Sequence, residues 1–464
     1  MSRPRIAVIG SGIAGLGAAH RLAHLCDVTV FEADSRLGGH ANTVDITLPG
    51  PEGDVTHGVD TGFLVFNERT YPRLIALFDE LGVTVAKSEM TFSVQAPRPD
   101  GSQLEWSGTS LNTVFADRGN LLRPRFHGML LDLMRFNRLA TALARRGNDG
   151  ELAQPLDEFL ASHRFGGAFI DDYLLPMIGC IWSCSTVQML RFPVGTLIRF
   201  CHNHGLLQVR ERPQWFTVTG GSRQYVDKLA SRIGRVRLDT LVLAVRRDLS
   251  RDAGFGATHG GRVSVRTHAG IEWFDEAVLA THAPQTLSML ADACPDERRT
   301  LGAIGYQDNE AVLHTDATLL PRRRAAWAAW NYERDIVAGS NSQNVCLHYL
   351  LNQLQPLPWR QPVIVSLNPL HAPREETVLR RITYAHPVFD NAAIAAQARL
   401  PTLQGRSHVW FCGAWTGYGF HEDGLKSGQQ AADRILERLA ASAASGSMSP
   451  GVARADAPAL LEAA

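Results

Sequence analysis

Three glycines near the start of the chain, Gly10, Gly12 and Gly15, have the G-x-G-x-x-G spacing that can bind the phosphates of a dinucleotide. In this arrangement Gly10 permits a tight turn, Gly12 lets backbone N–H groups approach a pyrophosphate, and Gly15 lets the next helix pack closely. The intervening positions are Ser11, Ile13 and Ala14. The alternative is a glycine-rich turn that binds no ligand.

The elements around this turn favour phosphate binding. The apolar run at 5–9 is typical of a buried parallel strand, and the glycines then open a helix whose dipole directs its positive end at the phosphates. A second strand at 28–31 ends in Glu32, about 20 residues after the turn, where a carboxylate can bind the ribose of an adenosine. Strand, turn, helix and acid in this order predict a dinucleotide site.

The segment after Glu32 favours a flavin over a nicotinamide cofactor. Arg36-Leu-Gly38-Gly39-His40 is an R-x-G-G element, with which the chain resembles the FAD-dependent amine oxidases and phytoene-type desaturases. The resemblance implies that the glycine pair wraps the pyrophosphate of FAD. Members of the family usually have a basic residue after the pair, and His40 takes that position here.

Two further segments resemble FAD elements of the same family. Thr61 and Gly62 follow Asp60 in a D-x-G-like element, which implies a place beside the flavin ring. A strand end followed by a turn is the alternative. Val242 lies in a valine-rich strand that the resemblance places at the adenine side of FAD.

The closing FAD segment is a strand ending at Gly413, followed by a G-x-x-x-S-G helix that contains Gly424 and Leu425. The resemblance implies that this helix approaches the flavin, and its N-terminus can stabilise negative charge at N1 and O2. Ala414 and Trp415 stand where the family has a glutamate.

The resemblance implies an α/β fold with a Rossmann-like FAD-binding domain in three discontinuous segments and an inserted α+β substrate domain. We expect residues 1–66, 216–290 and 401–440 in the FAD-binding domain and residues 67–215 and 291–400 in the substrate domain. The Ala/Ser/Gly/Pro-rich stretch 441–464 is expected to be a disordered tail. Periodicity also predicts a helix over 72–81 and a hairpin of 264–267 with 273–279.

Composition narrows the classes of protein and partner. The formal net charge is zero, which gives no support for nucleic-acid binding. No apolar run reaches the roughly 18 residues that span a bilayer, and no signal-peptide pattern precedes the first strand. The scattered cysteines predict reduced thiols in a cytoplasmic protein. No metal site is expected, because no set of ligands has a complete spacing; the nearest residues are Cys180, Cys184, His202 and His204.

Two arginine-rich segments indicate contact with a lipid surface. The helical pattern from Leu111 to Gly147 alternates apolar residues with arginines, and Arg322–Arg324 precede Trp327 and Trp330. Such mixtures are typical of lipid interfaces, although a helix of this kind can also cover a core with its solvated face outward. We expect peripheral contact with the inner face of the membrane.

The runs 36–43, 330–332 and 419–424 resemble a bacterial branch associated with cyclopropane-fatty-acid-synthase-like methyltransferases, which includes desaturases of methyl-branched acyl chains. The resemblance implies an FAD-dependent oxidoreductase that desaturates an unsaturated or methyl-branched fatty acyl chain of a lipid by hydride transfer to flavin N5. The alternatives are an amine oxidase that uses O2 and a non-catalytic flavin-containing partner of a lipid methyltransferase.

Desaturation also needs a base that removes a proton from carbon. The placement of the motifs makes His421 or His386 the candidate base, because the residue before Pro387 is held extended and can present an imidazole. A packed loop histidine is the alternative for His386. Companion roles are predicted for three neighbours of His421: Glu422 or Asp423 would orient or tune the base, and Lys426 would lie near flavin N1.

Overall fold

The computed structural model describes residues 3–98, 100–146, 152–182, 189–208, 212–248, 262–334 and 346–446. Its N-terminal strand lies inside a five-stranded, wholly parallel sheet with the order β10-β2-β1-β14-β20. The central strands are buried on both faces, which is why they read as apolar runs. The strands are β1 (Arg5–Ile9), β2 (Asp27–Phe31), β10 (Arg235–Arg237), β14 (Glu276–Leu279) and β20 (Val409–Phe411). Segments far apart in sequence therefore form one sheet, as expected for a discontinuous FAD-binding domain.

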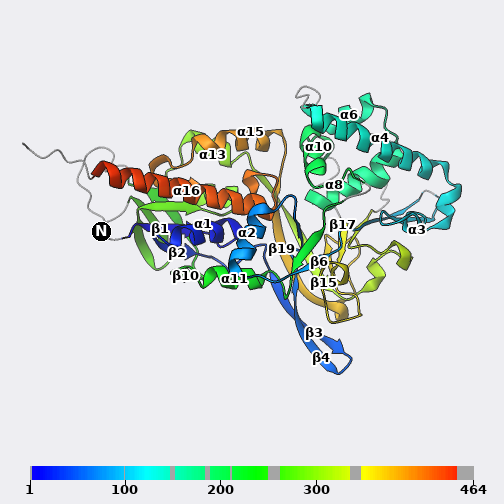
Figure 1. Ribbon diagram of the computed structural model, residues 1–464, viewed down its shortest axis with the longest axis horizontal. Helices are drawn as coiled ribbons and strands as arrows, with labels where there is room; N and C mark the ends of the chain where they lie inside the picture. Colours follow the sequence, from blue (N-terminus) through cyan, green and yellow to red (C-terminus); the bar gives the residue numbers. More distant parts are fainter. Residues whose placement is uncertain are drawn as a thin grey trace, which may run out of the picture.

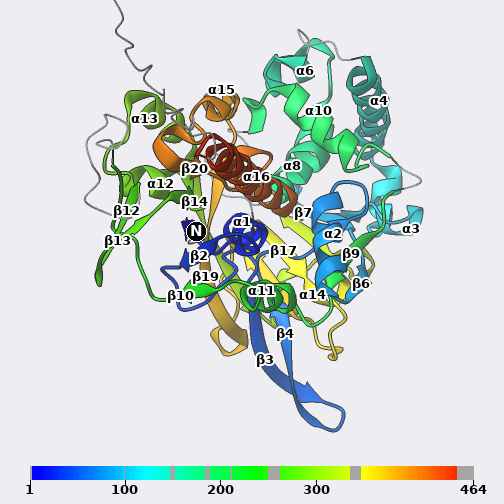
Figure 2. The same cartoon turned by 60° about the vertical axis from the view of Figure 1, so that its left-hand side comes forward.

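Helices cover this sheet, with α1 and α16 lying against each other along it (Figure 1). The contact is close because both helices carry glycines: a Cβ at Gly428 would lie 2.0 Å from Ala14 O. A small three-stranded sheet lies beside the parallel sheet (Figure 2). These elements are α1 (Ile13–Ala23), α11 (Arg223–Ala230), α12 (Ala283–Met289), α13 (Pro295–Leu301), α15 (Asn391–Arg399), α16 (His421–Gly446), β11 (Ala244–Arg247), β12 (Val263–Thr267) and β13 (Gly270–Phe274).

The second large unit is a seven-stranded sheet with the order β19-β15-β18-β17-β16-β7-β8. Neighbouring strands are antiparallel except for β16 and β7, which are parallel. Side chains alternate between its two faces, so one face can line a cavity while the other packs elsewhere. The strands are β7 (Phe92–Pro97), β8 (Gln103–Ser107), β15 (Gly305–His314), β16 (Trp330–Glu333), β17 (Cys346–Leu350), β18 (Ile364–Leu367) and β19 (Val378–Val388).

A group of helices joins the seven-stranded sheet and lies at the end of the molecule remote from α1 and α16 (Figure 1). Its core is aromatic: the Phe136 ring lies 5.4 Å from that of Phe169 and 5.7 Å from that of Phe165. The helices are α3 (Leu111–Val114), α4 (Pro124–Arg146), α6 (Leu156–Ser162), α7 (Gly167–Phe169), α8 (Leu175–Trp182) and α10 (Val194–Asn203).

Short elements connect the two units. The β3–β4 hairpin extends away from the body (Figure 2), and β9 pairs with both β5 and β6. The remaining elements are β3 (Thr43–Gly50), β4 (Gly53–Asp60), β5 (Phe66–Asn67), β6 (Val85–Ser88), β9 (Trp215–Val218), α2 (Pro72–Leu81) and α14 (Leu351–Leu354). Among the described residues, no helix is both long and apolar enough to cross a bilayer.

Several expectations from the sequence are confirmed and others need correction. The helix over 72–81 is confirmed as α2, but it packs on α16 and α11, so it lies with the FAD-binding elements. The hairpin partner of β12 is β13, whereas residues 276–279 leave the hairpin and join the parallel sheet as β14. The tail expected from 441 is still helical as far as Gly446, and the remainder lies outside the described residues.

Candidate active site

A cavity of about 900 Å³ begins at the glycine turn after β1 and extends to one face of the seven-stranded sheet. Most of the residues predicted to bind the cofactor line it, although they come from segments hundreds of residues apart. They are Gly10, Ser11, Gly12, Ile13, Ala14, Glu32, Arg36, Gly38, Gly39, His40, Thr61, Gly62, Val242 and Gly413.

The glycine turn is built for close approach by a ligand. Gly10 has φ +98°, and a Cβ there would lie 2.8 Å from Ala280 O, so no other residue fits without strain. At Gly12 a Cβ would meet no protein atom within 4 Å, so the backbone is open toward the cavity. Ser11 donates from its backbone N to Glu32 Oε2 across 2.9 Å, which ties the turn to the end of β2. Gly38 N in turn donates to Ser11 O, which places the R-x-G-G element against the turn.

Two predicted cofactor residues, Gly424 and Leu425, have a packing role instead, and Gly15 has the packing role that the spacing of the turn predicted. Gly15, Gly424 and Leu425 do not line the cavity. A Cβ at Gly15 would lie 1.9 Å from Gly10 O, and one at Gly424 would lie 2.8 Å from Ile13 Cγ2. Leu425 fills the space beside Gly17. These residues hold α16 and the glycine turn in place, so their effect on a bound cofactor is indirect.

His40 carries a buried polar atom that lacks a protein partner. Its Nε2 has no hydrogen-bond partner among the described residues, and the side chain lines the cavity. Its ring lies 4.9 Å from that of Tyr384 and 5.4 Å from that of His386. Burial, with a smaller effect of His386, lowers its pKa well below the usual value, so the ring is neutral. An unpaired buried nitrogen beside an open glycine turn fits a polar ligand such as FAD.

A hydroxyl network lies next to His40. Thr61 Oγ1 donates to Asn42 O across 3.0 Å, so the Tyr384 hydroxyl donates to Thr61 Oγ1 across 2.7 Å. Asn42 Nδ2 donates to Tyr384 Oη across 2.9 Å. Both hydroxyls are therefore satisfied by the protein, and the phenol ring is fixed against the cavity.

The tautomer of His386 follows from a chain of amides. Glu310 N donates to Asn368 Oδ1, which leaves Asn368 Nδ2 to donate to Asn309 Oδ1 across 2.8 Å. Asn309 Nδ2 then donates to His386 Nδ1 across 3.0 Å. Because Nδ1 accepts, the neutral imidazole carries its proton on Nε2. Burial lowers the pKa of His386 to about 4, so this neutral form persists at neutral pH.

His386 therefore presents an N–H donor, and its lone pair is already engaged. It lies on the edge strand β19, which continues through Pro387, rather than in a loop. Proline is tolerated there because an edge strand has one unpaired side. The predicted role of general base does not suit this tautomer.

His421 begins α16 and is buried against Phe63, whose ring lies 3.8 Å away and nearly parallel. Its Nε2 lies 2.6 Å from the hydroxyl of Tyr225 on α11. Burial lowers the pKa of His421 to about 3 and raises the pKa of Tyr225 well above its usual value. The pair is thus a neutral imidazole and a protonated phenol that share one short hydrogen bond beside the cavity.

The three companions predicted for His421 are used elsewhere. The Glu422 carboxylate accepts from the backbone N atoms of Arg73 and Leu74, each across 3.0 Å, and so caps α2. Asp423 Oδ2 accepts from Tyr418 N and Phe420 N, which fixes the loop before α16. Glu422, Asp423 and Lys426 are absent from the described residues that line the cavity. The Glu422 and Asp423 side chains thus stabilise the fold around His421, whereas Lys426 is exposed. The predicted orienting or tuning of the base by an acid needs correction.

The far end of the cavity is aromatic and aliphatic. Phe200 organises one wall, with ring centroids 4.8 Å from Trp182, 3.9 Å from His204 and 5.0 Å from Phe420. The seven-stranded sheet supplies the opposite wall with Trp330, Tyr349, Val365 and Leu367. The acidic residues that line the cavity are Glu32 and Asp34 at the dinucleotide end and Asp308 near His282.

The positions of these residues fit an α/β fold that binds FAD. The comparison with known proteins leads to the same conclusion. A model of the family described as flavin containing amine oxidoreductase matches residues 13–315. The chain belongs to this family. It is accordingly an FAD-dependent oxidoreductase, and the expected α/β fold is confirmed.

Solved structures of this flavoprotein fold align with nearly the whole chain. A conjugated-linoleic-acid-producing fatty acid isomerase from P. acnes is 17% identical over 94% of this chain and 98% of its own, with a TM-score of 0.62. Cyclohexylamine oxidase from Brevibacterium oxydans IH-35A is 16% identical over 94% of this chain and 100% of its own, with a TM-score of 0.64. At these identities the likeness concerns the fold.

A curated relative matches a short part of the chain. Mitochondrial protoporphyrinogen oxidase from Nicotiana tabacum is 41% identical over 71 residues, which are 13% of this chain and 14% of that protein. The match therefore says nothing of the substrate of this flavin-containing oxidoreductase.

Sequence motifs missed several residues of this flavoprotein site. Tyr384, Asn309 and Tyr225 carry no cofactor motif, and they reach the cavity or its histidines through strands β19 and β15 and helix α11. Asp308, the neighbour of Asn309 on β15, was not predicted by any motif either. The spacing of Tyr384 and His386, two apart on one strand, was the sequence signal that could have located Tyr384, since residues i and i+2 of a strand share a face.

The buried histidines predict acid sensitivity of this flavoprotein. Burial lowers the pKa of His204 and His386 to about 4 and of His421 to about 3. In the unfolded chain each has a pKa near 6.5, so between about pH 6.5 and 4 the unfolded state binds more protons and the free energy of unfolding falls as pH falls. Asp60 and Asp423, whose pKa values burial raises to about 6, oppose this loss in the same range.

We expect urea midpoints to fall steadily from pH 7 to pH 5, because each buried histidine removes up to about 2 kcal/mol of unfolding free energy over this range before the carboxyls offset part of it. His204→Asn, which keeps a donor for Phe200 O, should flatten the pH dependence. A midpoint that is constant or rises toward pH 5 would contradict this assignment of neutral buried histidines.

Proposed function

We propose that this oxidoreductase dehydrogenates a fatty acyl chain of a lipid, with an unsaturated or methyl-branched chain as the substrate class. The observation that carries the proposal is the far end of the cavity, which is built from aromatic and aliphatic side chains around Phe200, Trp330 and Tyr349. An acyl chain gains about 0.8 kcal/mol for each CH2 buried in such a space.

The charge of the cavity favours the same class of substrate over an amine. Its histidines are neutral, because burial lowers the pKa of His40, His204, His282, His386 and His421. A protonated amine at the aromatic end would lose its hydration with little more than ring faces to compensate. An uncharged chain has no such cost.

Bound FAD supplies an acceptor for a hydride from the substrate. The proton from the adjacent carbon needs a second acceptor, and we assign this to Nδ1 of His421, which has a free lone pair when Nε2–H donates to the Tyr225 hydroxyl across 2.6 Å. The phenol oxygen then stabilises the positive charge that develops on the imidazole when Nδ1 is protonated. His386 has a different role, because its Nε2–H can donate to the ligand while Asn309 holds its other nitrogen.

The residues at the other end of the cavity would hold FAD. The glycine turn and the R-x-G-G element would hold the pyrophosphate, Glu32 the ribose, and Val242 the adenine side. His40 Nε2 is left as a donor or acceptor for the cofactor.

The experiment is analysis of lipid after incubation with the holoprotein and an artificial electron acceptor. We expect acyl chains that have lost two hydrogens, detected by mass spectrometry, and no aldehyde from simple amines. Conversion of an amine to an aldehyde, with acyl chains unchanged, would show an amine oxidase instead.

The role of Asn309 can be tested by changing the tautomer of His386. In Asn309→Asp the carboxylate would accept Nδ1–H and raise the pKa of His386 toward or above its usual value. We expect a new inflection between about pH 5 and 8 in the rate of flavin reduction. Asn309→Ser is the neutral control and should show no such inflection; the same profile in both variants would refute the amide-set tautomer.

The exposed face of α4 supports peripheral membrane contact. Leu131 is 63% exposed and Met134 52%, and both share one helix face with Arg138. Leu122, at the end of the short helix Arg118–Leu122 just before α4, is 88% exposed. Arg145 and Arg146 end the same helix. Exposed leucines beside arginines match the surface of an anionic bilayer, which would also be the source of the acyl chain.

The second segment expected at the lipid surface needs correction. Trp330 lines the cavity, and Trp327 Nε1 donates to Pro321 O. Arg323 pairs with Glu105 and Asp117. The two tryptophans thus contact the protein itself and exposed Arg323 is engaged in ion pairs, so the proposal of membrane contact rests on α4 and the short helix before it.

Replacing Leu122 and Leu131 together by Asp should weaken binding to phosphatidylglycerol-containing vesicles by at least about tenfold, because burial of two leucines is lost and charge repulsion is added. Vesicle sedimentation measures this. Ile271→Asp, at an equally exposed position in β13, is the matched control and should bind like the wild type. Equal binding of all three proteins would exclude α4 as the contact.

A further inference from the structure

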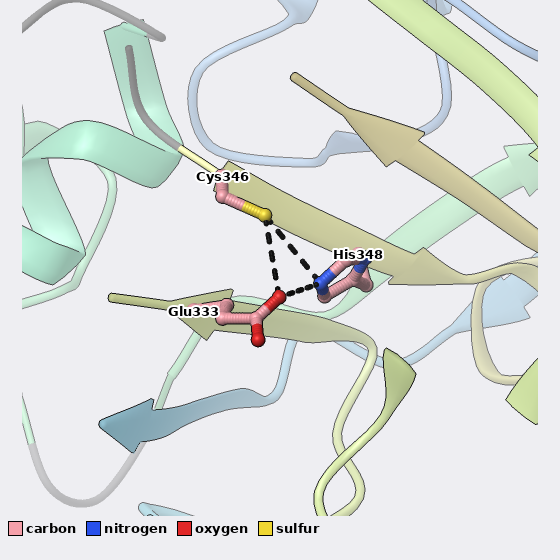
Figure 3. Close-up of side chains that lie close together, drawn as sticks. All are labelled: Glu333, Cys346 and His348. Carbon is pink, nitrogen blue, oxygen red and sulfur yellow. Dashed lines mark hydrogen bonds and ion pairs between the residues drawn. The ribbon is translucent and has the colours of Figure 1, made fainter. Parts of the chain in front are cut away.

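Three side chains of different metal-binding types converge on the seven-stranded sheet (Figure 3). Glu333 ends β16, and Cys346 and His348 lie two apart on β17, with Glu333 directly opposite Cys346. His348 Nε2 lies 2.9 Å from Glu333 Oε2, and Cys346 Sγ lies 3.6 Å from Glu333 Oε2 and 3.5 Å from His348 Nε2. The three ligand atoms thus form a compact triangle.

We propose that Glu333, Cys346 and His348 bind a divalent zinc ion. A tetrahedral zinc with a Zn–S distance of about 2.3 Å and Zn–N and Zn–O distances of about 2.0 Å separates its ligand atoms by roughly 3.3 to 3.6 Å. Both separations that involve Cys346 Sγ already have such values. The third is shorter because a hydrogen bond from His348 Nε2–H joins the imidazole and the carboxylate. When a cation takes the place of that proton, the imidazole carries its proton on Nδ1 instead and the separation opens by a few tenths of an ångström.

The chemistry of the set suits zinc. A thiolate and an imidazole are preferred ligands of zinc and a carboxylate completes a neutral site, since two negative charges offset the ion. Binding forms a Zn–S bond and releases the thiol proton of Cys346 to solvent. Cys346 and His348 are buried, whereas the Glu333 side chain is 17% exposed, which leaves a path for entry and a fourth position for water.

A second layer of residues orients His348. Its Nδ1 lies 2.6 Å from Ser366 Oγ on β18. Asp316 N donates to His314 Nδ1, so His314 donates from Nε2 to the same Ser366 Oγ across 2.6 Å. Ser366 Oγ has two lone pairs and can accept from both rings, which leaves His348 Nε2 free for the ion.

The position of the site suggests what it does. Tyr349, next to His348, and Val365, next to Ser366, point to the other face and line the cavity. Zinc would join β16 to β17 behind this wall and hold the wall rigid. The role is structural, and it does not depend on which substrate the cavity accepts.

The test is zinc retention by the FAD-loaded protein after incubation with zinc chloride and dialysis, measured by mass spectrometry of the metal. We expect about one zinc per chain in the wild type and at least tenfold weaker binding in Cys346→Ser, with Ser366→Ala in between. Cys26→Ser, at another buried cysteine, should retain zinc like the wild type. Cobalt in place of zinc should give ligand-field bands to the red of the flavin absorption that Cys346→Ser abolishes.

If Cys346→Ser does not fold, Glu333→Gln provides the same comparison, because it keeps the shape and the hydrogen bond to His348 but removes the charge. Wild-type protein that retains no zinc would overturn the proposal. So would equal retention in the wild type and both variants, which would place the metal elsewhere.

Discussion

Gly12→Val is expected to give a folded protein that binds FAD roughly 100-fold more weakly. Gly12 has φ −64° and ψ 175°, a conformation open to any residue, and an added Cβ meets no protein atom within 4 Å. The valine side chain would occupy the space that the pyrophosphate needs. The binding free energy of FAD would then lose one or two charge-assisted hydrogen bonds of about 1.5 to 3 kcal/mol each.

Flavin absorbance after gel filtration and fluorescence titration with FAD measure this loss. Circular dichroism should show an unchanged fold. Gly234→Val, at an exposed glycine where a Cβ also meets nothing within 4 Å, is the matched control and should keep its flavin. A Gly12→Val protein as yellow as the wild type would show that the glycine turn does not bind the cofactor.

His421→Ala should lower the rate of flavin reduction by substrate by about 10² to 10⁴, the range typical of a lost general base. FAD should remain bound, because the glycine turn is untouched. Tyr225→Phe removes the hydroxyl that lies 2.6 Å from His421 Nε2 but keeps the ring, so a smaller loss of about tenfold is expected.

Anaerobic stopped-flow reduction of the flavin separates this step from reoxidation. Glu422→Gln is an informative control, because its side chain caps α2 and should affect stability more than rate. Full activity of His421→Ala would remove His421 as the proton acceptor. A larger loss of the flavin reduction rate in Glu422→Gln than in His421→Ala would support the catalytic role for this acid that the sequence suggested.

The cofactor half of the site was predictable because its chemistry depends on the backbone. Gly10 is fixed by a turn that few other residues can adopt, Gly12 by the space that a phosphate needs, and Glu32 by the length of one strand–helix–strand unit. Local spacing therefore locates them. The motif of the closing helix could not tell that Gly424 contacts other protein atoms, since close packing and ligand approach both select glycine.

The catalytic half was less predictable because its partners meet through tertiary structure. Asn309 and His386 are diagonal neighbours across the β15–β19 strand pair, and Tyr225 reaches His421 from a helix almost 200 residues earlier in the chain. Glu422 is adjacent to His421 in sequence, yet the helix turns its carboxylate toward α2. Adjacency in sequence was therefore a poor guide to contact.

The proposed zinc site was not predicted from the sequence for a related reason. Cys346 and His348 have the spacing that puts two ligands on one strand face, but their third partner belongs to the neighbouring strand. From the sequence, other cysteines and histidines were the nearest candidates for metal ligands. Of these, Cys180 and His204 line the cavity, and Cys184 lies outside the described residues.

The most direct test of the account is an anaerobic visible spectrum of the holoprotein before and after addition of phospholipids with unsaturated or methyl-branched acyl chains. The account predicts loss of the oxidised-flavin absorbance with these lipids and none with simple amines. Bleaching by an amine and not by the lipids would contradict the proposed acyl substrate, and no bleaching by either would contradict dehydrogenation by this chain alone.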